Sequence, residues 1–313
     1  MKTVWLTYSW ALVALLLLPP QVEATWSVMA DADCRYRLSD LDDNQATLHV
    51  LGASLRKTFS DSKGDRFTLF GLVEAHDNLS EFMMHELYGL YKGPLGSWNV
   101  TLGRFGLPYG LLTNYSTSRL PFDMPHRAVI GYAVDNGIML SGVKGMWEYA
   151  VAGTQGYGPH HTPGFPGHGL ATARLGITPG YSGDVTLGIS GAFGKTSHMH
   201  NRDSTTERAV GGVDATLYSG RLLTRLELNG GMVDDKLMAT GFAAFDFALL
   251  PRLDINVAVT GIRHGDQLQD SWFSGVTYKP KWFTVRGGYR YARYEKPHHQ
   301  VELQIYRLFS FNY

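Results

Sequence analysis

A two-residue alternation of apolar and polar side chains constrains this chain more than any other feature. Hydrophobic side chains recur at every second position from Val185 to Ile189 and from Leu253 to Val259, with Asp, Asn, Thr, Gly or Ala between them. A β-strand points successive side chains to opposite faces, so each such segment is expected to be a strand with one apolar face. Similar segments of about ten residues, separated by turn residues, recur from residue 44 to the end of the chain. The pattern predicts an all-β protein.

Alternation alone does not say where the apolar faces point, because soluble sandwiches and barrels also alternate, with their apolar faces inward. The N-terminus bears on this question. Residues 1–24 have the form of a secretory signal peptide, with Lys2 at the start, an apolar run over 11–18 and a small-residue cleavage site at 22–24. The run is too short for a membrane-spanning helix. A long series of amphipathic strands behind an export signal favours a closed antiparallel transmembrane β-barrel.

Composition narrows the functional classes. Charged residues make up 18% of the chain and the formal net charge is zero, so no global field would attract nucleic acid, and we expect no nucleic-acid partner. Cys34 is the single cysteine, which excludes an intramolecular disulfide. The sequence has no haem-attachment C-x-x-C-H and no glycine-rich phosphate loop. We therefore expect no cofactor and no metal site.

The last segment of the chain, Val301–Tyr313, is expected to be an aromatic-rich strand, and most of its apolar residues share one parity. It resembles the closing strand of bacterial outer-membrane β-barrels. That resemblance implies a location in the bacterial outer membrane, contact with its lipid, and recognition of Phe311 and Tyr313 by the barrel-assembly machinery.

The strand number is expected to be even, because both ends of such a barrel lie on the periplasmic side. About fifteen strand candidates follow residue 44. Residues 25–43 would then be either a first strand, giving sixteen strands, or a periplasmic segment, with fourteen strands in the barrel over 44–313. We favour sixteen. Short turns are expected at the periplasmic end, and longer connections, including 156–168, 194–207 and 263–269, at the outer end.

A long connection at 105–133 interrupts the pattern. Loops of this length are usually functional or disordered, and its many apolar and aromatic residues argue against disorder. It is expected either to fold into the lumen or to cap the barrel from outside. In the first case Arg104, Arg119 and Arg127 would form the pore constriction.

Three segments around this connection, Gly103–Gly110, Asp135–Gly142 and Trp147–Gly153, resemble the phosphate-selective porin O/P type. The resemblance implies a porin barrel. Phosphate selectivity in that family is associated with lysine and arginine in the pore, whereas this loop carries Arg119 and Arg127 but no lysine.

Charged residues also fall on the polar parity of many strands, where they would face a water-filled lumen. In a pore such charges set ion selectivity, although each one can also pair across strands. The lumen-facing candidates are Glu148, Arg174, Asp214, Arg225, Glu227, Asp254, Arg286 and Arg290.

The function favoured by the sequence is an outer-membrane porin for passive diffusion of small hydrophilic solutes or ions, and we leave open a homotrimer. An alternative is a barrel that houses a periplasmic partner such as a multihaem cytochrome in an electron conduit. A third is an outer-membrane barrel enzyme, a lipase or protease, although no serine with a convincing histidine and acidic partner stands out. We expect a protein that is not an enzyme. The paired histidines near residues 160, 198 and 298 are interpreted as solvated loop residues.

Overall fold

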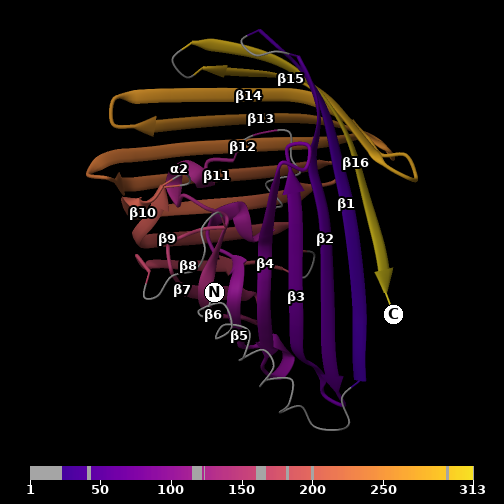
Figure 1. Cartoon of the computed structure of the whole chain (residues 1–313), viewed down its shortest axis with the longest axis vertical. Helices are drawn as coiled ribbons and strands as arrows, with labels where there is room; N and C mark the ends of the chain where they lie inside the picture. The colour runs from indigo at the N-terminus through magenta and orange to yellow at the C-terminus, as the bar shows by residue number, and fades with distance from the viewer. Residues whose placement is uncertain are drawn as a thin grey trace.

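The computed structural model describes residues 23–40, 44–114, 122, 124–159, 167–180, 183–198, 201–293 and 296–312. Antiparallel strands follow one another in sequence order around a ring, and the last strand pairs with the first (Figure 1). Within the described ranges these strands number sixteen. The predicted closed barrel of sixteen strands is confirmed.

Most of the described chain is strand, and the helical elements are short. The 3-10 turns are η1 (Pro94–Gly96) and η2 (Gly110–Asn114), and the α-helix is α2 (His126–Val129). No helix within the described ranges is long and apolar enough to cross a membrane. The strands are β1 (Glu23–Ser39), β2 (Gln45–Asp61), β3 (Gly64–His76), β4 (Glu81–Lys92), β5 (Asn99–Gly106), β6 (Val134–Lys144), β7 (Trp147–Thr154), β8 (Leu170–Ile177), β9 (Val185–His198), β10 (Asn201–Ser219), β11 (Leu222–Val233), β12 (Lys236–Leu250), β13 (Leu253–His264), β14 (Gln267–Tyr278), β15 (Thr284–Arg293) and β16 (Pro297–Asn312).

The two faces of the wall differ in polarity, and the apolar face points outward. On β8, Thr172 and Arg174 are buried inside the ring, whereas the alternating Leu175 is 41% exposed on the outside. β11 repeats this arrangement with Glu227 buried and Leu228 exposed. A soluble protein does not expose apolar side chains around a whole wall, whereas lipid covers such a surface in a transmembrane barrel.

The N-terminal segment forms a strand within the ring. β1 begins at Glu23 and pairs with β16 from Ser27↔Asn312 to Ser39↔Gln300, and with β2 on its other side. Of the two alternatives for 25–43, the structure therefore shows the first strand. Residues 1–22, which hold most of the expected signal peptide, lie outside the described residues.

Turns at the end of the barrel that carries both termini are short, as expected. At the opposite end, two of the expected long connections are strand instead. β9 and β10 stay paired as far as Asn201↔His198, and β13 passes into β14 with His264 paired to Gln267. The sequence prediction of loops over 194–207 and 263–269 was wrong because strand ends beyond the membrane are wet on both faces and lose their alternation. Gly265, at φ 59°, permits the tight β13–β14 turn.

Candidate functional site

The described part of the 105–133 connection packs against inward-facing residues of the strands and so lies inside the barrel. Figure 1 labels α2 beside β10 and β11. Leu107 and Tyr109 are almost completely buried. They form one apolar cluster with the inward-facing Val210 of β10, Val233 of β11 and Met238 of β12. Apolar burial on this scale holds the loop against one side of the lumen. Of the two positions that the sequence left open, the structure shows the inward one.

A second apolar cluster attaches the next part of the loop to the neighbouring strands. The ring of Phe122 lies 5.9 Å from that of Phe242 on β12 and 6.2 Å from that of Phe273 on β14, measured between centroids. Met124 belongs to the same cluster. The two clusters together place the loop against the inner wall from β8 to β14.

Polar contacts fix the position of η2. The Leu111 amide donates to Glu227 Oε2 at 2.9 Å, and the Tyr109 hydroxyl donates to Asn229 Oδ1 at 3.0 Å. Asn229 Nδ2 in turn donates to Glu227 Oε1. Gly110, at φ 51°, lies directly over the carboxylate, where a Cβ would come within 2.6 Å of Glu227 Oε2. Only glycine combines this backbone conformation with so close an approach.

Arg208 of β10 holds the other end of the loop. Its Nη1 donates to the carbonyl oxygens of Ala128 and Val129, both at 2.8 Å, and its Nε donates to Thr196 Oγ1 at 2.9 Å. The guanidinium therefore satisfies carbonyl groups at the C-terminus of α2 that lack helical partners. The sequence prediction missed Arg208 because it lies next to the segment that was interpreted as a loop.

Several of the expected lumen charges pair across strands on the wall that the loop covers. Arg174 of β8 donates to Asp214 of β10, with 2.7 Å between Nη2 and Oδ1, and also contacts Glu148 of β7. Gly188 of β9 lies between Arg174 and Asp214, and a Cβ there would collide with both side chains. Arg225 pairs with Asp246 at 2.5 Å. These charges form a layer of ion pairs along the inner wall.

The remaining candidates lie toward the other side of the lumen. Asp254 contacts Lys279 near the short-turn end. Arg286 and Arg290 share the inward parity of β15, where Arg286 Nη1 donates to Gln304 Oε1 at 2.8 Å. Arg290 pairs in register with Gln300 of β16.

The same side continues onto β1, which carries further charges that the sequence prediction did not single out. Arg35 Nη2 lies 2.8 Å from Asp33 Oδ2, and Arg37 Nε lies 3.0 Å from Glu302 Oε2. The side-chain amide nitrogen of Gln304, Nε2, donates to the same Asp33 oxygen at 2.7 Å. A charged and polar wall thus extends from β15 across β16 to β1.

The three arginines expected at the constriction, Arg104, Arg119 and Arg127, are not found together in the described part of the chain. Arg104 is 8% exposed, and its Nη1 donates to the carbonyl oxygens of Met84 at 2.8 Å and Pro159 at 3.1 Å, so it ties strands to a connection. Arg127 is exposed on α2. Arg119 lies outside the described residues. The terminal Tyr313 does so as well, whereas Phe311 is exposed on the outer face and pairs with Val28.

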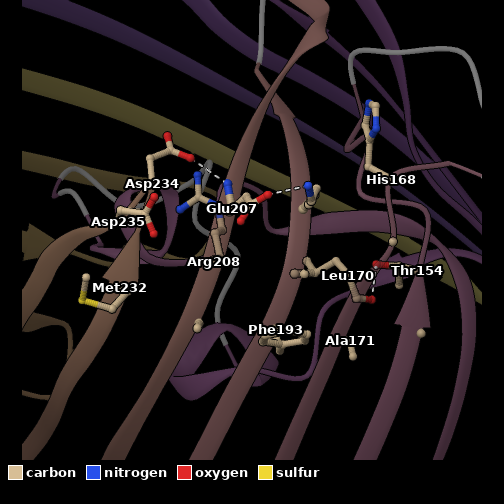
Figure 2. Close-up of a pocket in the computed structure, with 15 residues that line it drawn as sticks. Thr154, His168, Leu170, Ala171, Phe193, Glu207, Arg208, Met232, Asp234 and Asp235 are labelled. Carbon is tan, nitrogen blue, oxygen red and sulfur yellow. Dashed lines mark hydrogen bonds and ion pairs between the residues drawn. The ribbon is translucent and has the colours of Figure 1, made fainter.

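A separate cavity of about 610 Å³ lies on the outside of the wall. Figure 2 shows Phe193, Ala171 and Met232 around it, with Asp234 and Asp235 at its rim. Phe193, 71% exposed, belongs to the outward parity of β9. The cavity therefore opens on the outer face of the wall, although the inward-facing Leu170 and Arg208 also line it. Across the described ranges, no group of three or more His, Cys, Asp or Glu residues is placed to hold a metal ion.

No family model and no curated protein matches this sequence. Solved structures do match in shape. An anion-selective porin from Comamonas acidovorans is 13% identical, with a TM-score of 0.70, and the match covers 92% of this chain and 100% of that one. The chain has a porin fold.

Two further solved structures agree with that fold. The trimer form of OmpT, an outer membrane protein of Vibrio cholerae, is 11% identical, with a TM-score of 0.69 over 91% of this chain and 99% of that one. The outer membrane channel DcaP of Acinetobacter baumannii is also 11% identical, with a TM-score of 0.63 over 94% and 99% of the two chains.

Proposed function

We propose that this protein is a porin of the bacterial outer membrane, through which small hydrophilic solutes or ions diffuse passively. The observation that carries the proposal is the position of the 105–133 loop. It narrows a closed barrel whose outer face is apolar and whose inner face is charged. A polar lumen with a constriction is all that passive diffusion needs, so no cofactor is involved.

The solute path runs between the docked loop and the opposite wall formed by β15, β16 and β1 to β4. Arg127 is proposed to face this path from the loop, and Arg286 and Arg290 from the wall. Arg119, outside the described residues, stays a constriction candidate from the sequence. Water is scarce at such a narrow place, so charges on both sides act on a passing ion through a lowered effective dielectric. Arg104, directly before the loop, is proposed to contribute to the constriction by linking the end of β5 to Met84 of β4 and to Pro159.

The docked loop also favours a porin over the two alternatives. A housed cytochrome would need the volume that Tyr109, Phe122 and their neighbours occupy. An enzyme would need a nucleophile and base brought together at the outer rim, and the contacts described above are structural ion pairs. We propose no enzymatic activity.

Phosphate selectivity of the O/P type remains a hypothesis about the solute, supported by the arginines on both sides of the path. A homotrimer is proposed from the trimer form of the Vibrio cholerae neighbour. Delivery through the barrel-assembly machinery is proposed from the aromatic end of β16, with Phe311 and Tyr313 as its signal.

The test is single-channel recording of the purified protein in a planar bilayer, with the reversal potential measured in a KCl gradient and then with phosphate in place of chloride. We expect stable ohmic openings and a small ion preference. A selective loss of current in phosphate would contradict the O/P hypothesis alone. A folded, inserted barrel that passes no ions would overturn the porin proposal.

A further inference from the structure

A cluster of histidines surrounds one buried carboxylate on the wall opposite the docked loop. Glu74 of β3 is completely buried, and the alternating Val73 is exposed on the outer face, so the carboxylate belongs to the inner parity. His76 of β3, His85 of β4 and His49 of β2 lie around it, toward the end of the barrel away from the termini. The sequence prediction did not single out these residues.

Two of the imidazoles contact the same carboxylate oxygen. His76 Nε2 lies 3.1 Å from Glu74 Oε2, and His85 Nδ1 lies 3.2 Å from it. The His49 ring packs edge-on against that of His76, with 6.3 Å between centroids. His85 is 21% exposed and His76 is 16% exposed, so protons can reach both from the lumen.

This arrangement comes from irregularities in the strands. The β1–β2 register shifts between Asp33 and Cys34, next to His49, and the β3–β4 register shifts between Leu72 and Val73, next to His85. Such a bulge re-aims a side chain that regular pairing would direct elsewhere. The two shifts bring histidines from neighbouring strands toward one glutamate.

The charged groups around the cluster are mostly acidic. Burial and the nearby Arg35 disfavour a charge on His49, so this histidine is left out of the proton-binding pair proposed below. Besides Glu74, the charged groups that face the histidines from the neighbouring strands and turn are Asp33, Arg35 and Arg37 of β1, Asp77 of the β3–β4 turn, and Glu81 and Glu86 of β4.

We propose that His76 and His85 with Glu74 form a proton-binding selectivity site in the lumen, which shifts the channel toward anions when the outside becomes acidic. The inference rests on the proposed porin function. At neutral pH the cluster is net negative and attracts cations. Each proton that one of these two imidazoles takes up adds one positive charge to the wall of a narrow, poorly screened path.

The experiment measures the chloride-to-potassium permeability ratio of the intact channel in a KCl gradient between about pH 8 and about pH 5. We expect the ratio of the native protein to rise roughly threefold on acidification. The double variant His76→Gln, His85→Gln keeps amide donors near Glu74 but does not titrate in this range, and it should lose most of the rise. The variant Glu74→Gln removes the anion that favours protonation, so its rise should move to lower pH.

The matched control is His299→Gln on the outer face of β16, where His299 Nδ1 contacts the Tyr289 hydroxyl. It should keep the native response. If the double variant does not insert into the membrane, the single variant His85→Gln takes its place. Its permeability ratio should then rise less on acidification than that of the native protein. A full native response in the histidine variants would overturn the site but leave the porin function standing. A native protein that forms no channel at either pH would instead overturn the porin function.

Discussion

The two inner walls of this barrel are built from the same alternating strands but serve different purposes. The wall from β8 to β14 is covered by the 105–133 loop, and its charges, such as Arg174, Asp214 and Glu227, are buried in ion pairs and hydrogen bonds. The wall from β15 through β1 to β4 lies across the lumen from the loop and carries Arg286, Arg290 and the Glu74 cluster. Under the loop, Glu227 holds the loop backbone through the Leu111 amide. The uncovered wall has partly buried ion pairs of its own, such as Arg37 with Glu302, and we expect its partly exposed Arg286 and Arg290 to act on the solute.

Removing the loop should have the largest effect, because it makes both walls alike. Excision of residues 113–125 is expected to raise single-channel conductance roughly twofold or more, since the narrowest part of the path is lost. Conductance in a planar bilayer measures it, and heat-modifiable migration on a gel confirms that the barrel is folded. Unchanged conductance in a folded barrel would mean that the loop does not narrow the path.

A matched pair of carboxylates separates the two walls. Glu227→Ala removes the acceptor of the Leu111 amide, so the loop should loosen and the current should become noisy, with brief transitions of conductance. Glu302→Ala, on the wall that the loop does not cover, should leave the current quiet and move the reversal potential toward chloride. Equal noise in the two variants would remove the distinction between the walls.

Arginines on the two sides of the path should both influence ion selectivity. Variants on each side show which of them contributes more to the reversal potential. Neutralising Arg119 and Arg127 together is expected to shift the reversal potential toward potassium, because two cationic charges leave a narrow place. Arg290→Gln should shift it in the same direction from the opposite wall. If only the Arg290 variant shifts it, the loop narrows the path without selecting ions.

The smallest expected effect is acid loosening of the loop. Burial lowers the pKa of His126 to about 3, with a further lowering by the neighbouring Arg127. The docked loop thus holds this histidine neutral, and its docking is at full strength above the ordinary pKa of about 6.5 and weakens as the pH falls toward about 3.

We therefore expect more frequent conductance transitions near pH 4 than near pH 7, and His126→Gln should abolish the difference. This readout is the stability of the current, so it is separate from the permeability ratio that reports on the Glu74 cluster. Transitions that increase equally in the variant would assign the acid effect to another group.

The sequence by itself determined the class of fold. A side-chain period of two is a local property of strands, so alternation in segments such as 185–189 and 301–305, behind an export signal, was enough to predict an antiparallel barrel. An even strand count left sixteen or fourteen strands, of which sixteen was favoured. The sequence also identified Arg174, Asp214 and Glu227 as inward-facing, because parity is local as well. The ends of strands that extend beyond the membrane were not predicted as strand, because water on both faces removes the alternation.

Only the tertiary structure decided which of these residues meet. Glu227 and Leu111 are far apart in the chain, and Arg208 reaches α2 from another strand, so no local pattern could pair them. The histidines around Glu74 converge through two bulges whose positions depend on pairing between strands. Register and loop docking arise from long-range contacts, and a strand's own sequence sets its faces but not its neighbours' alignment.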